Sequence, residues 1–508
     1  MSQRPIRFVH RGAVVEVDGL PLTTTVLAWL REQARRTGTK EACNEGDCGA
    51  CAVLVGELDA DADGPTRLRW RPFNACLMFV AALDGKALRT VEDLPADHPA
   101  PLAMVTHHGS QCGFCTPGFV ISLAALHDRH HKDLTRPTRR EIADALAGNL
   151  CRCTGYRPIL DAGEAMFDAP PSAAPADDDA TRTALHRLRA DPPLEYAALQ
   201  PATGAVERWS APRTLDALAT AAAAQPDATL ISGATDIALW VNKQQRVLPA
   251  LIHVGAVPEL RRIERADGVL RIGAAAPLED AWAALTEQLP PLREMFLRFG
   301  SPLVRHAGTL GGNLVNGSPI GDGAPVLMAL GTTLLLRHGA VERTLALDHF
   351  YVDYLKNRRA PGELLVRIDV PLPGAATTLR AYKLAKRYDS DISALACGLV
   401  LVRDLADALA PVRDVRLVFG GLAATVRHAA QAEAAVRGQP WSEATLRAAQ
   451  AALAQDFQPL SDHRGSAAYR LRSARALLER FWLETRASDP LPAAMASVWH
   501  AAAGAPAA

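Results

Sequence analysis

The sequence has no excess of charge of either sign: its 55 lysines and arginines equal its 55 aspartates and glutamates. A basic surplus would favour binding to nucleic acid or to an anionic membrane surface. The balance supports neither. We therefore expect no nucleic acid and no membrane among the partners of this chain.

Long apolar runs are missing as well. No run approaches the roughly 18 to 20 apolar residues that a membrane-spanning helix needs, and we expect no secretory leader. The expected location is the cytoplasm, where the reducing environment disfavours disulfides. Neither GxGxxG nor GxxxxGK occurs, so the sequence does not support a Rossmann or P-loop nucleotide site.

Cysteine is almost absent from the larger part of the chain, because only Cys397 occurs after residue 153. Cys397 lies in the apolar run LACGLVLV, which indicates a small, buried hydrophobic residue. The other eight cysteines form two groups of four. In a reducing compartment, groups of four indicate metal sites more than disulfides.

The first group is Cys43, Cys48 and Cys51 in CNEGDCGAC, with Cys76 after 24 intervening residues. This is the CxxxxCxxC…C spacing of plant-type ferredoxins, which holds a [2Fe–2S] cluster. Glycines in the loop allow backbone amides to turn toward the cluster sulfurs. A zinc site with four cysteine ligands is the alternative, and the glycine-lined loop with three thiolates disfavours it.

The second group is Cys112 and Cys115 in QCGFC, followed after 35 intervening residues by Cys151 and Cys153 in CRC. Four thiolates again complete a cluster site. Paired cysteine elements also build structural zinc sites, however. On the residues alone, zinc stays open as the alternative for this group.

At 508 residues the chain is too long for one hydrophobic core, so several domains are expected. Residues 5–18 indicate two short strands with a turn at Arg11 and Gly12, and TTTVLAWLREQ has helical spacing. A hairpin, a helix and a cysteine loop together predict a β-grasp ferredoxin layout.

From about residue 85 to 167 the pattern becomes helical. Thr116 and Pro117 are typical of an N-cap and a first-turn proline, and Thr138 with Glu141 predicts a capping box. The helix after the capping box should carry one apolar stripe that runs into CRC. The expected stripe is Ile142, Leu146 and Leu150.

Composition predicts the domain boundaries. Residues 168–190 contain proline, alanine and acidic residues where a linker is expected, and VPLPGAA at 370–376 marks a second boundary. The predicted units are 1–84, 85–167, the linker 168–190, 191–376, 377–485 and a frayed tail 486–508.

Two glycine-bearing turns follow the cysteine groups: LISGATDI at 230–237 and TLGGNLVNGSPIGDGAP at 309–325. Backbone amides at such turns can bind a pyrophosphate. A flavin is the usual converter between one-electron clusters and a two-electron partner. By itself, each turn is weak evidence.

In this order, the motifs CNEGDCGAC, QCGFCTPG and GNLCRCTGYRPI resemble the small, iron–sulfur and FAD subunit of two-subunit bacterial xanthine dehydrogenases, in the molybdenum hydroxylase superfamily. The resemblance covers residues 5–485. It implies an α+β multidomain chain with a β-grasp [2Fe–2S] ferredoxin domain, a helical-bundle [2Fe–2S] domain, a vanillyl-alcohol-oxidase-type FAD domain and an α/β flavoprotein C-terminal domain.

The resemblance also implies which residues hold FAD. The turn at 230–237 would be the first pyrophosphate loop and 309–313 the second, and a tyrosine would stand near the nicotinamide approach. Relatives more often read Tyr-Arg-Lys-Thr where Leu355 follows that tyrosine here. The implied residues are Leu230, Ile231, Ser232, Gly233, Ala234, Thr235, Asp236, Ile237, Phe299, Thr309, Gly311, Gly312, Asn313, Asp322, Tyr354, Leu365 and Lys383.

The function implied by the resemblance is electron transfer during the oxidation of hypoxanthine and xanthine to urate. Electrons would pass from a molybdenum cofactor through two [2Fe–2S] clusters to FAD and then NAD⁺. The partner would be a molybdopterin-binding large subunit in a dimer of heterodimers, with Gln111 at the interface and His107 and His108 outside the ligand set. No catalytic residue beyond those that hold redox cofactors is expected on this chain.

Three alternatives remain. The chain could be the small subunit of another molybdenum hydroxylase, acting on an aldehyde or an N-heterocycle. It could be a stand-alone iron–sulfur flavoprotein reductase. A non-enzymatic scaffold with bound zinc is the third, and it predicts a colourless protein.

Overall fold

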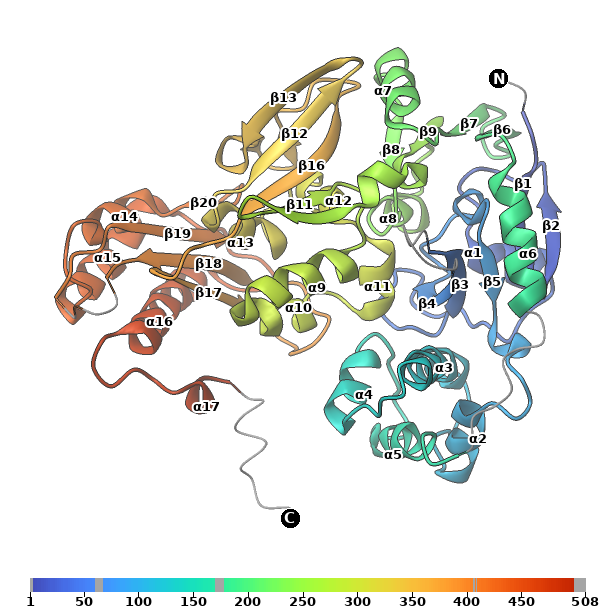
Figure 1. Ribbon diagram of the computed structural model, residues 1–508, viewed down its shortest axis with the longest axis horizontal. Helices are drawn as coiled ribbons and strands as arrows, with labels where there is room; N and C mark the ends of the chain where they lie inside the picture. Colours follow the sequence, from blue (N-terminus) through green and yellow to red (C-terminus); the bar gives the residue numbers. More distant parts are fainter. Residues whose placement is uncertain (1–2, 60–66, 170–177, 405–406, 408, 498–508) are drawn as a thin grey trace.

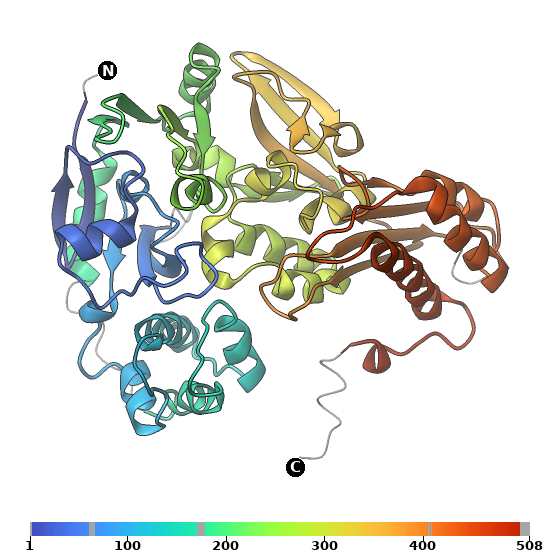
Figure 2. The ribbon, with the colours of Figure 1, turned by 180° about the vertical axis from the view of Figure 1, so that it is seen from behind.

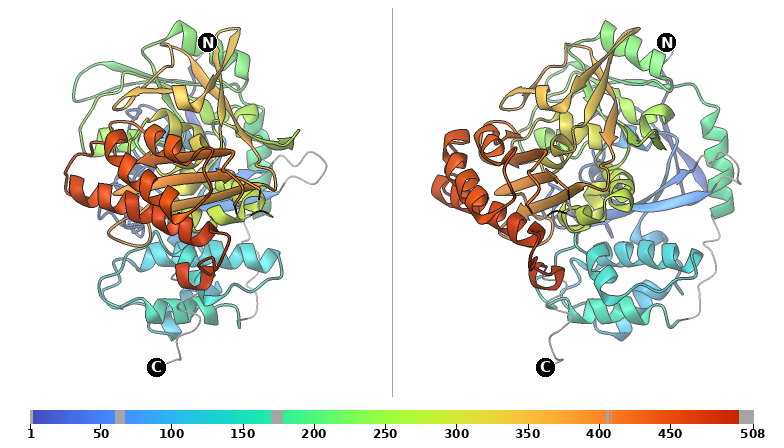
Figure 3. Two further views of the ribbon diagram at one scale, coloured as in Figure 1. Left: turned by 90° about the vertical axis from the view of Figure 1, so that its left-hand side faces the viewer. Right: turned by 60° about the vertical axis from the view of Figure 1, so that its left-hand side comes forward.

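The computed structural model describes residues 3–59, 67–169, 178–404, 407 and 409–497. The first sheet (blue) and the last sheet (orange) lie at opposite ends of the long axis, with a two-part central region between them (Figures 1 and 2). The helices that follow the first sheet (cyan) lie below it (Figure 3). The α+β multidomain organisation is confirmed, while the exact domain boundaries stay predictions.

The first sheet has the strand order β2-β1-β5-β3-β4, with β1 and β5 parallel. The predicted hairpin is confirmed, and both turn residues, Arg11 and Gly12, have positive φ angles. The predicted helix begins as α1 and continues as a π-helix, and its Trp29 packs edge-on against Phe8 at 5.2 Å. The elements are β1 (Ile6–His10), β2 (Ala13–Val17), α1 (Val26–Ala28), η1 (Trp29–Gln33), β3 (Ala52–Leu58), β4 (Leu68–Asn74) and β5 (Ala87–Arg89).

Four helices form the next unit: α2 (Pro99–Thr106), α3 (Thr116–Lys132), α4 (Arg139–Ala145) and α5 (Arg157–Ala165). The capping box before α4 is confirmed, since the backbone N–H of Thr138 donates to Glu141 at 2.8 Å and that of Glu141 donates to Thr138 at 3.3 Å. The expected N-cap of α3 is wrong by one residue. Cys115 takes that position, and the Thr116 hydroxyl donates to Ser110 instead.

The apolar stripe expected through α4 holds for two of its three members. Ile142 and Leu146 are buried, but α4 ends at Ala145 and Leu150 is exposed. The backbone N–H of Leu150 instead donates to the carbonyl of Cys48 at 3.0 Å. A contact between two domains therefore overrides the helical periodicity.

Part of the predicted linker is a helix, α6 (Asp178–Arg189). Its buried residues, Thr181, Ala184, Leu185 and Leu188, have the i, i+3, i+4, i+7 spacing of one helical face. That face packs on the first sheet against β1 and β2. The acidic and proline-rich composition hid this pattern, and residues 170–177 of the expected linker lie outside the described residues.

The central region has two parts. In the first, the sheet order is β6-β7-β9-β8, with β7, β9 and β8 parallel; in the second, β10-β11-β16-β12-β13 is antiparallel throughout. The first part contains β6 (Leu194–Leu199), β7 (Val206–Ala211), α7 (Leu215–Ala224), β8 (Thr229–Ile231), α8 (Ile237–Asn242) and β9 (Ala250–His253).

The second part follows from residue 263. It contains β10 (Ile263–Ala266), β11 (Val269–Gly273), α9 (Leu278–Gln288), α10 (Arg293–Arg298), α11 (Pro302–Ala307), α12 (Leu310–Val315), α13 (Gly323–Ala329), β12 (Thr333–His338), β13 (Val341–Ala346), the hairpin β14 (Tyr351–Asp353) and β15 (Lys356–Asn357), and β16 (Leu364–Pro371). Short 3₁₀ helices are η2 (Val80–Leu83), η3 (Val91–Asp93), η4 (Val254–Ala256), η5 (Pro258–Arg261), η6 (Pro290–Leu292) and η7 (Leu347–His349).

The last unit is an antiparallel sheet, β17 (Thr377–Leu384), β18 (Leu395–Val402), β19 (Asp414–Gly420) and β20 (Arg427–His428), covered by α14 (Ala430–Val436), α15 (Glu443–Asp456) and α16 (Ala467–Thr485). Cys397 is fully buried in β18, as predicted. The expected tail contains the short α17 (Ala493–Ala496), and residues 498–508 lie outside the described part. Among the described helices, none has the length and apolar character needed to cross a membrane.

Candidate redox-cofactor sites

The first cysteine group gathers around the loop between η1 and β3. Cys43, Cys48 and Cys51 lie in this loop, and Cys76 follows β4. Cys51 and Cys76 are buried, while Cys43 and Cys48 are partly exposed. The thiols contact in pairs, Cys43 with Cys48 and Cys51 with Cys76.

The loop needs left-handed backbone at Asn44, Gly46 and Gly49. Gly46 has a φ of 81°, which favours glycine, and a Cβ there would lie 2.3 Å from a Leu77 methyl carbon. Both the backbone conformation and the close packing therefore require glycine at this position. The Asn74 amide donates to the Gly46 carbonyl at 3.0 Å and holds the loop against β4. The sequence therefore shapes a narrow concave loop lined with thiols.

Mutual hydrogen bonding splits the thiol pKa values within each pair. The bond from Cys48 lowers the pKa of Cys43 to about 5 against the opposing effect of burial, while the pKa of Cys48 is raised. In the same way the pKa of Cys51 is lowered and that of Cys76 is raised. Four thiolates cannot share this space without a cation, so the site fits a cationic metal centre.

The second group lies at helix ends. Cys112 and Cys115 precede α3, and Cys151 and Cys153 lie between α4 and α5. The thiols again pair, Cys115 with Cys151 and Cys112 with Cys153. Cys112 and Cys153 are exposed, so this site opens to the surface.

Local contacts differentiate the thiols of the second group. Burial raises the pKa of Cys115 to about 12. The pKa of Cys151 is lowered: burial opposes the shift, and a 3.3 Å hydrogen bond from the Thr154 hydroxyl contributes to it. The Tyr156 hydroxyl accepts from the backbone N–H of Cys151 at 3.1 Å and fixes the CRC turn.

The two domains that carry the cysteine sites pack closely against each other at several glycines. A Cβ on Gly49 would lie 2.3 Å from the Gly148 carbonyl oxygen, and one on Gly118 would lie 2.2 Å from the Gly49 carbonyl oxygen. The Asn149 amide donates to that same Gly49 carbonyl at 3.3 Å. The loop that carries one site is thus packed directly against the chain that leads into the other.

The two predicted FAD turns meet each other in the central region. A Cβ on Gly233 would lie only 1.6 Å from the Ala307 carbonyl oxygen, and Ala234 has a φ of 59°. The side chain of Thr309 caps α12 by accepting from the backbone N–H of Gly312 at 3.1 Å. The turn at 230–237 therefore lies against the chain just before the turn at 309–313.

The second turn continues toward Asp322 and Lys383. A Cβ on Gly323 would lie 2.6 Å from Asn313 Oδ1, an atom that is buried and has no hydrogen-bond partner among the described residues. Asp322 is buried, and it accepts a hydrogen bond from Lys383 Nζ at 2.5 Å and from Ser393 Oγ at 2.5 Å. Removing one member of such a buried pair typically costs about 3–5 kcal/mol, so the pair holds β17 to the start of α13.

The other predicted FAD residues are distributed unevenly around this region. Phe299 is the C-cap residue that follows α10, and it packs against Trp282 with ring centres 5.8 Å apart. Leu365 is buried in β16, beside Val366, whose carbonyl accepts from Ala274 N–H. Tyr354 is 58% exposed at the tip of the β14–β15 hairpin. This hairpin packs on the segment 309–325, because the Tyr351 hydroxyl donates to the Leu314 carbonyl at 3.1 Å and the Asn357 amide donates to the Val315 carbonyl at 2.9 Å.

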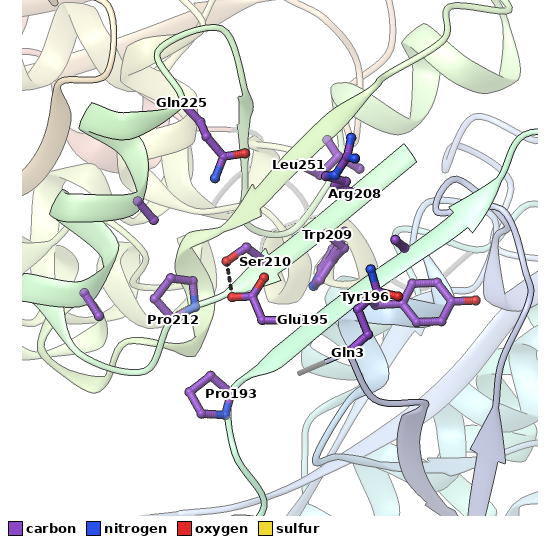
Figure 4. Close-up of a pocket in the computed structure, with 13 residues that line it drawn as sticks. Gln3, Pro193, Glu195, Tyr196, Arg208, Trp209, Ser210, Pro212, Gln225 and Leu251 are labelled. Atoms are coloured by element: carbon purple, nitrogen blue, oxygen red, sulfur yellow. Dashed lines mark hydrogen bonds between the residues drawn. The ribbon is translucent and has the colours of Figure 1, made fainter. Parts of the chain in front are cut away.

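A cavity of about 360 Å³ lies elsewhere, between β6, β7 and α7 (Figure 4). Glu195 and Ser210 hydrogen-bond to each other at 2.7 Å on its wall. Its lining contains none of the residues proposed above for FAD or for the clusters. It is therefore distinct from the candidate cofactor sites.

Some contacts at these sites were not predicted. Asn242 and Lys243, at the end of the helix α8 that follows the first FAD turn, donate to the carbonyls of Cys76 and Cys43, respectively. Ser393 donates to Asp322. No local spacing marks these residues, because each acts across more than 70 residues of sequence.

The donor sets fit the groups that the motifs imply. Eight thiols in two sets of four match the ligands of two [2Fe–2S] clusters. At the glycine-bearing turns, the buried Asn313 Oδ1 has no hydrogen-bond partner among the described residues, so a polar atom is available there to a dinucleotide.

Four family models match the chain. They are described as a 2Fe-2S iron-sulfur cluster binding domain (residues 9–81), a [2Fe-2S] binding domain (90–164), an FAD binding domain in molybdopterin dehydrogenase (203–373) and a CO dehydrogenase flavoprotein C-terminal domain (380–485). Two [2Fe–2S]-binding domains and one FAD-binding domain are therefore present, in the predicted order.

Curated relatives include xanthine dehydrogenase of Emericella nidulans, 31% identical over 95% of this chain, and xanthine dehydrogenase/oxidase of Rattus norvegicus, 30% identical over 90%. The match spans 39% and 37% of the length of these two relatives.

Among solved structures, a carbon monoxide dehydrogenase from Hydrogenophaga pseudoflava is 25% identical with a TM-score of 0.51, covering 56% of this chain and 98% of that one. A quinoline 2-oxidoreductase chain from Pseudomonas putida is 23% identical with a TM-score of 0.50, covering 55% and 97%, and shows likeness of fold alone.

Proposed function

Because this chain belongs to the molybdenum hydroxylase family, we propose that it is the electron-transfer subunit of a cytoplasmic xanthine dehydrogenase. When bound, its clusters and FAD would supply the one-electron and two-electron chemistry that carries electrons from a partner's molybdenum cofactor to NAD⁺. The observation that carries the electron-transfer role is the close packing of the loops that bear the two cysteine sites, at Gly49 and Gly148. The similarity to xanthine dehydrogenases that are 31% and 30% identical supports the choice of enzyme.

The residues of this chain have the task of holding and insulating the redox groups. Cys43, Cys48, Cys51 and Cys76 would bind the plant-type cluster, and Cys112, Cys115, Cys151 and Cys153 the second one. Burial of Cys51 and Cys76 keeps water from the inner side of the first site. The turn at 230–237 would bind the pyrophosphate by backbone N–H groups, as glycine-rich turns commonly do. In the turn at 309–313, the backbone N–H groups of residues 310–313 already donate within the protein, so this turn would contact FAD through its side chains.

A partner surface is supported by the exposure around the second cysteine site. Large apolar side chains that are normally buried are exposed in the segments that carry the cysteines, where the thiols of Cys112 and Cys153 are exposed too. Gln111, which was expected at an interface, is exposed as well. The exposed apolar residues are Phe114, Leu150 and Tyr156.

We infer that a molybdopterin-binding subunit covers this surface. Close approach is required because electron transfer needs the partner's cofactor near the exposed edge of the site. We propose a dimer of heterodimers, in line with the resemblance described above.

The second candidate is the same subunit in a molybdenum hydroxylase with another substrate. The similarity to the solved carbon monoxide dehydrogenase supports this second candidate, because that enzyme is named for a different substrate. Substrate specificity would then belong to the partner, and the residues of this chain would have the same roles.

The test is to purify the protein from its own cells and to assay iron, sulfide, flavin and molybdenum together with the visible spectrum. We expect four irons and one FAD per chain, molybdenum on a co-purifying larger subunit, and NAD⁺ reduction with xanthine. Zinc without flavin would contradict the proposal. Full cofactor content without activity on purines would favour the second candidate.

A further inference from the structure

Helix α8 connects the first FAD turn to the first cysteine site. It begins at Ile237, where the turn ends, and it ends at Asn242, which lies against the cysteine loop. The Asn242 amide donates to the Cys76 carbonyl at 2.9 Å. The next residue, Lys243, donates from Nζ to the Cys43 carbonyl at 2.7 Å.

These two hydrogen bonds reach both ends of the ligand set. Cys43 is the first cysteine of the loop, and Cys76 is the distant one that closes the site. Asn242 also lies within 3.4 Å of the Asn44 carbonyl, next to Cys43. The end of α8 therefore holds the two separate chain segments that carry the thiols at a fixed spacing.

Lys243 adds a positive charge at the same place. Its ammonium lies 3.4 Å from Glu45, an acidic residue inside the loop between Cys43 and Cys48. The Lys243 side chain is 43% exposed, so solvent screens part of its field. The opposite charges of Lys243 and Glu45 thus act on the cysteine site from its outer side.

We propose that Asn242 and Lys243 are positioning residues that raise the reduction potential of the plant-type cluster. The inference rests on the proposed function, because it requires a cluster on these cysteines. Reduction adds one negative charge to a cluster, and nearby cations and hydrogen-bond donors stabilise the reduced form more than the oxidised form. The negative charge of Glu45 lowers the reduction potential, and the positive charge of Lys243 offsets this effect.

The proposal predicts how electrons distribute between the two clusters. A higher reduction potential at the plant-type cluster, beside α8, would favour the electron on that cluster, next to the FAD turns, over the second cluster at the exposed site. Because α8 is continuous with the first FAD turn, the same helix that shapes the flavin site also tunes the neighbouring cluster.

The test is a redox titration of the holoprotein followed by EPR, in which each cluster has its own signal. Lys243→Met should lower the midpoint potential of the plant-type cluster and leave that of the second cluster unchanged. Lys243→Arg, which keeps the charge, should stay close to the parent protein. Arg447→Met on α15 is the matched control, because it removes the same charge from the far end of the molecule.

A second variant keeps the inference testable if Lys243→Met does not assemble its cluster. Glu45→Gln should raise the midpoint potential of the plant-type cluster, and added salt should reduce the difference from the parent protein. An unchanged potential in Glu45→Gln, or in an assembled Lys243→Met, would overturn the inference. Fewer than two EPR signals in the parent protein would instead contradict the proposed function.

Discussion

The carbonyl oxygen of Cys48 accepts a 3.0 Å hydrogen bond from the backbone N–H of Leu150. Cys48 belongs to the first cysteine site, and Leu150 is followed directly by Cys151 of the second. One hydrogen bond therefore joins the backbones of the two sites. Its geometry depends on the close approach of Gly49 to Gly148.

Gly49→Ala should separate the two cysteine sites. The new Cβ would meet the Gly148 carbonyl at 2.3 Å, in addition to the strain of φ +68°. Gly85→Ala is the matched control, because Gly85 has φ +72° with open space around it and should cost only about 1–2 kcal/mol. We expect a larger loss of thermal stability in Gly49→Ala and a weaker magnetic interaction between the reduced clusters. Equal stability losses in both variants would contradict a close domain contact.

Replacing Cys43 by Ser should remove the plant-type cluster, and replacing Cys151 by Ser should remove the second one. Each variant should lose two irons of four and one EPR signal, because a cluster needs its full thiolate set. Cys397→Ser is the control, since Cys397 is buried in β18 away from both groups. A single EPR signal in the parent protein would contradict the two-site assignment.

Gly233→Ala should empty the flavin site while leaving both clusters assembled. The added carbon would lie 1.6 Å from the Ala307 carbonyl oxygen, so the two FAD turns must move apart. Gly374→Ala, at a position with open space, is the matched control. Flavin and iron released by acid denaturation give the two readouts. Full FAD content in Gly233→Ala would show that these turns do not hold the flavin.

Lowering the pH should weaken the contact between the first sheet and the central region, because His306 lies at this contact. This residue lies on α11, and its Nδ1 contacts the Pro72 carbonyl of β4 at 3.1 Å. Burial lowers the pKa of His306 to about 4, whereas an exposed histidine titrates near about 6.5. Between these values the unfolded chain binds a proton that the folded chain does not, so stability falls as the pH drops from about 6.5 to 4.

The expected loss from His306 alone is about 3 kcal/mol once the pH is below 4. Melting temperatures measured from pH 8 to 4 should fall more steeply in the parent protein than in His306→Gln, which cannot gain a proton. The buried His253, whose pKa burial lowers to about 3, adds the same trend in both proteins and so cancels in the comparison. Parallel pH profiles would contradict this role of His306.

Local sequence was sufficient where the chemistry depends on neighbouring residues. The spacing patterns predicted both thiol groups, although Cys76 and the CRC pair are separated by 24 and 35 residues from the cysteines that they join. Thr138 with Glu141 predicted a capping box because one helical turn brings these two residues together. The order of the four domains was implied by the resemblance of the motifs to a known family, and the family comparisons agree with it.

Contacts between distant segments could not be read from the sequence. The pairing of Lys383 with Asp322, the bonds from Lys243 and Asn242 to the cysteine loop, and the exposure of Tyr354 all depend on how separate domains pack. A lone lysine or asparagine has no periodicity that distinguishes a buried or bridging position from a solvated one. The linker composition likewise concealed α6, whose apolar face has meaning only against the first sheet.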